Sequence, residues 1–212
     1  MTTREFLVVG DLQAQERAST LSKRVQGAED GSLFTSMSLP PYAEMARLGE
    51  GWSVMSTAAV AALVVRPSTL ALITLWNGET TGGKSYIMDR AFAHNLVGVA
   101  NSSYGIWLCV HPAGMAAVTA DITAIRGNTG KGYNGLAKVD VGATVVADGW
   151  FPWGNAGHAV TVTVPGGQVE VLVDGRLIVP PSAGISLQVV ADATGATFTS
   201  GFSWYEKKLS ML

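Results

Sequence analysis

The sequence predicts an all-β protein built from antiparallel strands, in the form of a sandwich or a barrel. From Trp52 onward, runs of β-branched residues are cut at short intervals by Gly, Asn, Asp and Pro. This pattern is typical of many short strands joined by turns. No long helical pattern alternates with these runs, and no repeat of 34 or 40 residues recurs. A parallel α/β sheet is therefore disfavoured.

Residues 1–50 precede the strand pattern and are predicted to form an N-terminal arm. Within the arm, residues 11–26 are rich in helix formers, and their apolar residues recur loosely at helical spacing, which favours a short helix. Pro40 and Pro41 then interrupt any regular element. The arm either wraps a neighbouring subunit or forms a partly ordered tail. Residues 51–212 are predicted to form one β domain, a reasonable size for a single core.

The clearest strand signals lie near the C-terminal end of this domain. Val and Thr alternate along residues 158–164, and a second alternating run covers residues 168–173. Gly166 and Gly167 separate the two runs, and an Asp-Gly pair follows the second. Because such pairs form tight turns, residues 158–179 are predicted to form a β-meander.

The composition favours contacts between subunits and argues against binding to nucleic acid. Charged residues make up only 14% of the chain, against 48% hydrophobic residues, whereas about a quarter is usual for charged residues. A surface with so few charges does little to keep molecules apart, so we expect a homo-oligomer. The formal net charge of -2 provides no basic surface for phosphate backbones, so no nucleic-acid partner is expected.

Several other classes of protein are also disfavoured. The lone Cys109 cannot form an intramolecular disulfide, and no Cys and His spacing suits a structural metal, so no metal or cofactor is predicted. Residues 6–9 are too short an apolar run for a signal peptide, and none is expected. Residues 54–65 are too short to span a bilayer, so no membrane partner is expected.

One segment matches the phosphate-binding loop of nucleotide enzymes. Residues 78–85, GETTGGKS, fit the pattern G-x-x-x-x-G-K-S and follow an apolar run. Such a loop must open a helix, because the helix N-terminus holds the phosphates. The surrounding sequence instead favours strands, so the segment is interpreted as a Gly-rich loop between antiparallel strands.

The sequence contains no convincing catalytic residues, and the protein is predicted not to be an enzyme. His94, His111 and His158 are scattered along the chain without the spacing of a ligand pair. Cys109 and His111 share one face of a strand, but their neighbours are typical of a core, which favours a buried structural cysteine.

An aromatic loop is the best candidate for a contact with a ligand or partner. Trp150, Phe151 and Trp153 lie close together and are followed by Asn155. They could stack against a sugar or anchor a partner surface. The alternative, which the sequence favours, is that tryptophan closes one end of the sandwich as part of the core.

The sequence of the β region resembles those of bacteriophage and virus virion proteins with jelly-roll bodies. The resemblance covers residues 51–206 and is carried by five segments: GWSV at 51–54, AALVVRPS at 61–68, LWNG at 75–78, GKSYI at 83–87 and GFSWY at 201–205. It implies a jelly-roll sandwich of two antiparallel sheets, assembled as a symmetric oligomer, often a trimer, on the surface of a particle. It supplies no catalytic residues.

Three functions follow from these expectations, in order of support. The first is a structural virion component, such as a minor capsid, cement (decoration) or fibre-base protein, made in the host cytoplasm and acting through contacts with itself and with other virion proteins. The second is a glycan- or receptor-binding module that uses the loop from Trp150 to Asn155. The third is a nucleotide-binding enzyme that uses residues 78–85.

Overall fold

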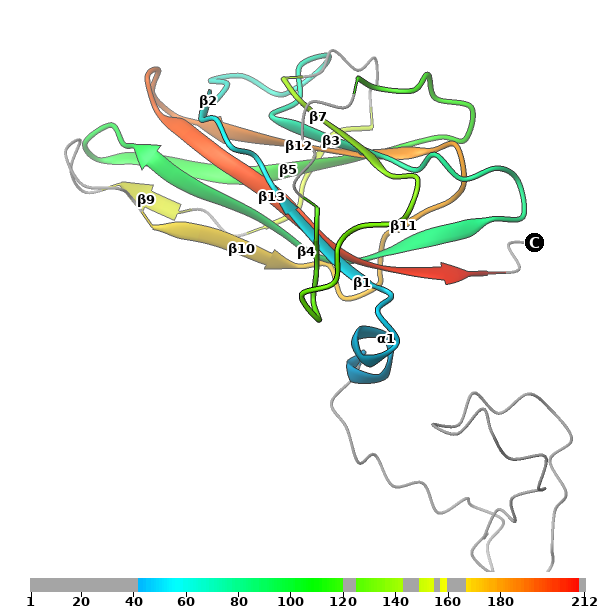
Figure 1. Ribbon diagram of the computed structural model, residues 1–212. Helices are drawn as coiled ribbons and strands as arrows, with labels where there is room; N and C mark the ends of the chain where they lie inside the picture. The colour runs from blue at the N-terminus through cyan, green and yellow to red at the C-terminus, as the bar shows by residue number, and fades with distance from the viewer. Residues whose placement is uncertain (1–41, 120–124, 143–148, 155–156, 160–166, 210–212) are drawn as a thin grey trace, which may run out of the picture. The chain divides into compact units, whose positions relative to one another are not determined.

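Strands make up nearly all of the regular structure in the computed structural model of the chain (Figure 1). The structure describes residues 42–119, 125–142, 149–154, 157–159 and 167–209. The chain divides into two compact units, Met1–Glu44 and Met45–Leu212. The elements are α1 (Ala43–Arg47), β1 (Gly51–Met55), β2 (Val60–Ala61), β3 (Ile73–Trp76), β4 (Lys84–Val97), β5 (Ser102–His111), β6 (Arg126–Gly127), β7 (Lys138–Val141), β8 (Phe151–Pro152), β9 (Gly157–Ala159), β10 (Gln168–Leu172), β11 (Ile178–Val179), β12 (Gly184–Ala191) and β13 (Thr197–Lys208).

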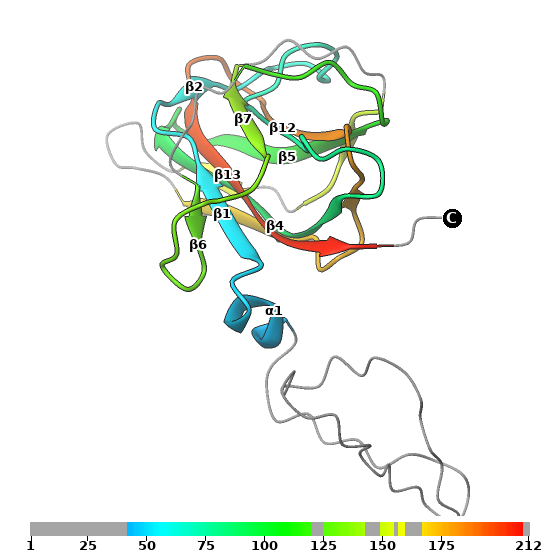
Figure 2. The same ribbon diagram turned by 45° about the vertical axis from the view of Figure 1, so that its right-hand side comes forward.

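The strands form two sheets that pack face to face, as Figures 1 and 2 show. The first sheet has the order β10-β4-β13-β1-β6, with β11 beside β4 and β2 beside β13. The second has the order β7-β3-β12-β5-β8, with β9 beside β5. All of these pairs are antiparallel. The prediction of an all-β antiparallel sandwich is confirmed.

The strand pairs are nested in the order of a jelly roll. β1 pairs with β13, β3 with β12, β4 with β10, and β5 with both β8 and β9. Each pair lies between the two strands of the previous pair in the sequence, and successive pairs alternate between the two sheets. The chain thus pairs like one long hairpin wound around a core, which is the jelly-roll arrangement.

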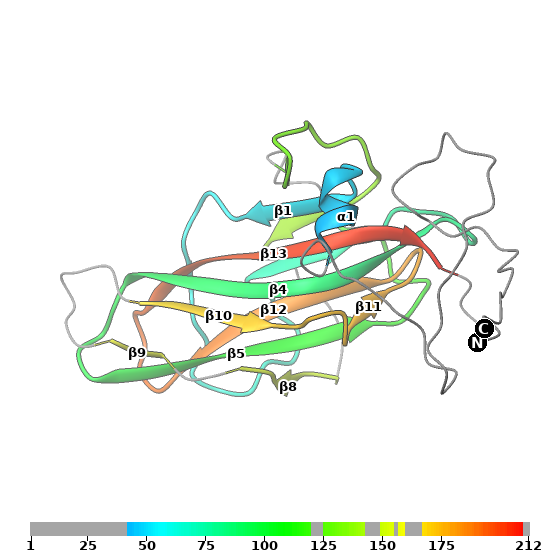
Figure 3. The same cartoon turned by 90° about the horizontal axis from the view of Figure 1, so that it is seen from below.

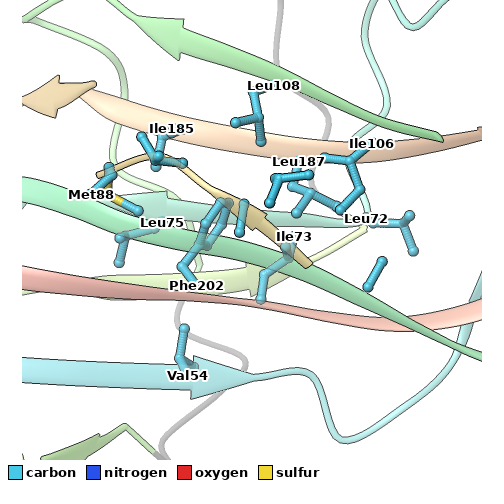
Figure 4. Packing of buried hydrophobic residues seen from close by; sticks show 14 of the residues in the cluster. Val54, Leu72, Ile73, Leu75, Met88, Ile106, Leu108, Ile185, Leu187 and Phe202 are labelled. Atoms are coloured by element: carbon cyan, nitrogen blue, oxygen red, sulfur yellow. The ribbon is translucent and has the colours of Figure 1, made fainter. Parts of the chain in front are cut away.

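The core lies between the two sheets and is filled by their inward-facing side chains. In Figure 4, Val54 and Phe202 from the first sheet face Ile185 and Leu187 from the second. The alternating runs that predicted strands explain this packing, because every second residue of a strand points to the same face. At Gly201 a side chain would collide with the Val54 carbonyl, so glycine is required for β1 to approach β13.

The predicted β-meander over residues 158–179 is wrong. β9 pairs with β5 in the second sheet, whereas β10 pairs with β4 in the first, as Figure 3 also shows. β10 and β11 both pair with β4, so the bend at Asp174 and Gly175 does not reverse the chain. Gly175 instead donates a hydrogen bond to the Met88 carbonyl and keeps the chain alongside β4. Alternation identified β10 as a strand but could not identify its partner, and residues 160–166 of the predicted meander lie outside the described residues.

The helix predicted over residues 11–26 lies outside the described residues. The structure has a different short helix, α1 (Ala43–Arg47), directly after the two prolines, which the sequence analysis did not predict. The first strand, β1, begins at Gly51. No helix in the described part of the chain is long and apolar enough to cross a membrane.

Candidate functional site

The phosphate-loop lookalike lies at the turn from β3, in the second sheet, to β4, in the first, and these two strands do not pair with each other. Asn77 holds this turn: its side-chain amide donates to the carbonyls of Lys84 (2.9 Å) and Val179 (3.0 Å). Its oxygen accepts a hydrogen bond of 3.0 Å from the Glu79 amide. Lys84 is the first residue of a strand, so residues 78–85 do not lead into the helix N-terminus that would hold phosphates.

The Lys84 side chain is engaged with a carboxylate that is fully buried. Its ammonium lies 3.4 Å from Oε2 of Glu206, whose side chain has no exposed surface. Oε1 of Glu206 accepts hydrogen bonds from the Tyr133 hydroxyl (3.1 Å) and from the Trp204 indole N–H (3.4 Å). Burial, and then the negative charge of Glu206, raise the pKa of Tyr133 above its ordinary value. Tyr133 therefore acts as a donor to the carboxylate, and the cluster ties β4, β13 and the loop containing Tyr133 together.

The first residue of the aromatic loop, Trp150, is buried. Its side chain is 2% exposed and belongs to a small apolar cluster with Ala71 and Cys109. Cys109 lies on the face of β5 that points away from the main core, because it alternates with the inward-facing Leu108. Trp150 thus covers the outer face of the second sheet, and its ring is not available to a ligand at the surface.

Phe151 and Trp153 lie along the open side of the sandwich. Phe151, in the edge strand β8, is 38% exposed, and its ring centroid lies 5.3 Å from that of Trp153. The Trp153 backbone amide donates to the Ile106 carbonyl of the second sheet, and its indole N–H donates to the Leu172 carbonyl of the first. The Arg176 guanidinium lies over the Trp153 ring, 5.5 Å from its centroid. Trp153 therefore links the two sheets, and one face of its ring is already covered.

The three described residues of the predicted contact do not form one surface. Trp150 is buried, while Phe151 and Trp153 contact each other at the sandwich edge. Asn155 lies outside the described residues. The sequence favoured a tryptophan that closes one end of the sandwich as part of the core. Trp150 instead covers the outer face of the second sheet.

A chain of buried polar groups crosses the outer face of the second sheet. Ser186 shares hydrogen bonds with Thr74 (2.8 Å) and with Nε2 of His111 (2.7 Å), and Nδ1 of His111 lies 4.0 Å from the Cys109 sulfur. All four side chains are at least 97% buried. Burial raises the pKa of the Cys109 thiol and lowers the pKa of His111. A thiolate is thereby disfavoured, so the arrangement suits a structural network better than a nucleophile.

The sequence analysis missed Ser186 and Thr74. The only signal for them was a polar residue inside an apolar run, which is usually interpreted as a solvent-facing position of a strand. Here both faces of β12 are buried, so the hydroxyls must find partners within the protein.

We expect His111 to make the stability of the protein depend on pH. Its folded pKa is lowered below the ordinary value of 6.5, so at mildly acidic pH the unfolded chain binds more protons than the folded chain. The contribution of neutral His111 to the free energy of unfolding is fully present above pH 6.5. It is lost as the pH falls toward the folded pKa, by at most about 1.4 kcal/mol per pH unit. Urea unfolding at pH 7.5 and pH 5.5 measures this loss. In His111→Gln the loss should shrink, and an unchanged pH dependence would contradict the prediction.

Comparison of the chain with protein-family models, with curated proteins and with solved structures gives no match. Within the described residues, no three His, Cys, Asp or Glu side chains are grouped so that they could hold a metal ion. In this jelly-roll sandwich, the buried polar groups around Glu206 and those around Ser186 hold strands and loops together.

Proposed function

We propose that the protein is a structural component of a virion, such as a minor capsid, cement or fibre-base protein, and that it works through contacts between subunits. The observation that carries this proposal is the exposed apolar surface. Large apolar side chains remain 37% to 64% exposed at ten described positions: Leu48, Met55, Val64, Val65, Leu70, Leu96, Val97, Leu136, Phe151 and Leu172. Single exposed apolar residues are normal, but gathered ones mark surfaces that become covered by a partner.

Two further observations support an assembly role. The jelly-roll arrangement occurs in many capsid proteins, although it also occurs in lectins and other proteins, so the fold alone does not decide the function. The low share of charged residues, 14%, leaves little repulsion between copies.

The two alternative functions have less support from the geometry. Glycan binding would depend on Phe151 and Trp153, since Trp150 is buried and Arg176 covers one face of the Trp153 ring. Nucleotide binding would require Lys84 to leave Glu206, and the segment lacks the helix that a phosphate loop needs.

Light scattering on the purified chain tests the proposal. We expect a mass that is a multiple of 22.1 kDa, with a trimer as the leading expectation. The mass should persist in 1 M salt, because salt screens ion pairs but does not weaken apolar contacts. A monomer at micromolar concentration would contradict the proposal.

A further inference from the structure

The chain contains two Asn-Gly pairs, Asn77-Gly78 and Asn134-Gly135. An Asn-Gly pair is especially prone to lose ammonia without an enzyme, because glycine has no side chain to hinder the approach of its backbone nitrogen to the asparagine side chain. The other four asparagines precede Leu, Ser, Thr or Ala. The two Asn-Gly pairs are therefore the positions at which the fold decides whether deamidation occurs.

The two pairs lie beside each other in the structure. β3 pairs with β7, so Asn77, directly after β3, lies next to the segment that precedes β7. A Cβ atom at Gly78 would collide with the carbonyl oxygen of Leu136 in that segment. Figure 2 shows the segment between β6 and β7. One region of the molecule thus presents the same dipeptide in two different settings.

Asn77 is held in a way that opposes the reaction. It is fully buried. Its side-chain nitrogen donates to the carbonyls of Lys84 and Val179, and its side-chain oxygen accepts from the Glu79 amide. These three hydrogen bonds would have to be lost inside the protein before the side chain could turn toward the Gly78 nitrogen. The fold therefore protects Asn77.

Asn134 has none of these restraints. It is exposed, and neither its side chain nor the Gly135 amide makes a hydrogen bond to any residue in the described part of the chain. Water therefore reaches the side chain, and the Gly135 nitrogen has no carbonyl that holds its proton. Glycine is also required here, because a Cβ atom at Gly135 would collide with the Tyr133 hydroxyl. The packing thus keeps a reactive pair at the surface.

We propose that Asn134 is a site of spontaneous deamidation, and that formation of isoaspartate there loosens the buried cluster around Glu206. The Gly135 backbone nitrogen loses its proton and attacks the side-chain carbonyl carbon of Asn134. A C–N bond forms, the bond to the side-chain nitrogen breaks, and this nitrogen takes up a proton and leaves as ammonia. Water then opens the succinimide ring at either carbonyl. The product is aspartate or isoaspartate, with one more negative charge, and nothing is oxidised or reduced.

Isoaspartate lengthens the main chain by one methylene group between Asn134 and Gly135. The loop is fastened on both sides of this bond. The Tyr133 hydroxyl accepts a hydrogen bond of 2.6 Å from the Ala137 amide and donates to Glu206 at 3.1 Å. Gly135 lies against Tyr133 without space for even a Cβ atom. We expect the extra methylene group to displace Gly135 or Ala137 and so to weaken the hydrogen bonds of the Tyr133 hydroxyl.

Ageing of the full chain tests the selectivity. The folded protein is incubated at mildly alkaline pH, which favours loss of the amide proton, and tryptic peptides are analysed by mass spectrometry. Lys131 and Lys138 enclose Asn134 on a short peptide that excludes Asn77. We expect Asn134 to convert at least tenfold faster than Asn77 in the folded chain, and both to convert at similar rates in guanidinium. Equal rates in the folded chain, or no conversion of Asn134, would overturn the proposal.

Thermal melting of two variants tests the effect on the Glu206 cluster. As isoaspartate accumulates, the melting temperature of wild type should fall. Asn134→Gln should keep its melting temperature during the same incubation, because glutamine would have to close a larger ring. Freshly purified Asn134→Asp carries the new charge on a normal main chain and should melt close to fresh wild type. If aged wild type melts unchanged, or Asn134→Asp falls as far, the loosening by the lengthened main chain is wrong.

Discussion

Replacing Glu206 with alanine should lower the free energy of unfolding by about 3–5 kcal/mol. The substitution leaves the half-buried Tyr133 hydroxyl and the buried Trp204 indole N–H without their acceptor, a carboxylate whose side chain has no exposed surface. It also removes the partner of the Lys84 ammonium. Each buried donor without a partner costs roughly 1–3 kcal/mol, so the losses together approach the whole stability of many domains. Urea unfolding followed by circular dichroism measures the effect.

The control for this prediction is Glu206→Gln, which keeps an oxygen acceptor but removes the charge. We expect it to cost clearly less than the alanine variant, because Tyr133 and Trp204 can still donate to the amide oxygen. Equal losses in the two variants would show that the charge contact with Lys84 dominates. A loss below about 1 kcal/mol in the alanine variant would contradict the structural role of the cluster.

Replacing Trp150 with alanine should cost about 3 kcal/mol or more, because a large buried side chain is removed and a cavity is left behind. Trp150 contacts the outer face of the second sheet at Ala71 and Cys109. Its indole N–H is buried without a hydrogen-bond partner among the described residues. Trp150→Phe should therefore cost much less, since it fills most of the volume and removes the unpaired donor. Thermal unfolding of both variants measures the difference.

Phe151→Ala is the matched control for Trp150, because it removes an aromatic ring from the adjacent position. The Phe151 ring is 38% exposed, so its loss should cost less than half as much as that of Trp150. If Trp150→Ala left the melting temperature unchanged, Trp150 would not be part of the core, and its role as a contact residue would need to be considered again.

The strands of this fold could be predicted from the sequence, but their partners could not. The alternating run at residues 168–173 was correctly interpreted as a strand, β10, whereas most of the run at residues 158–164 lies outside the described residues. The same pattern suggested a meander because it contains no information on which sheet each strand joins. In a jelly roll the partner of β10 is β4, more than seventy residues away in the sequence, and only the packing of the whole core selects that pair.

Only part of the candidate site could be predicted, because burial, like strand pairing, depends on the packing of the whole fold. Residue type identified the aromatic loop, but the burial of Trp150 and the exposure of Phe151 depend on the outer face of the second sheet being covered. The buried hydrogen bonds of Ser186 likewise depend on the burial of this outer face. A sequence gives no direct sign that the outer face of a sheet is buried, because outward-facing positions are usually solvated.

The strand that comes last along the chain, β13, lies in the middle of its sheet between β1 and β4. A ribosome that makes this protein therefore releases β1 and β4 long before the strand that joins them exists. Until then both present unpaired backbone edges to water, and such edges can pair with other chains. Folding of the first sheet must therefore wait until β13 has been synthesised, and the open edges of β1 and β4 are a risk for pairing between nascent chains during that interval.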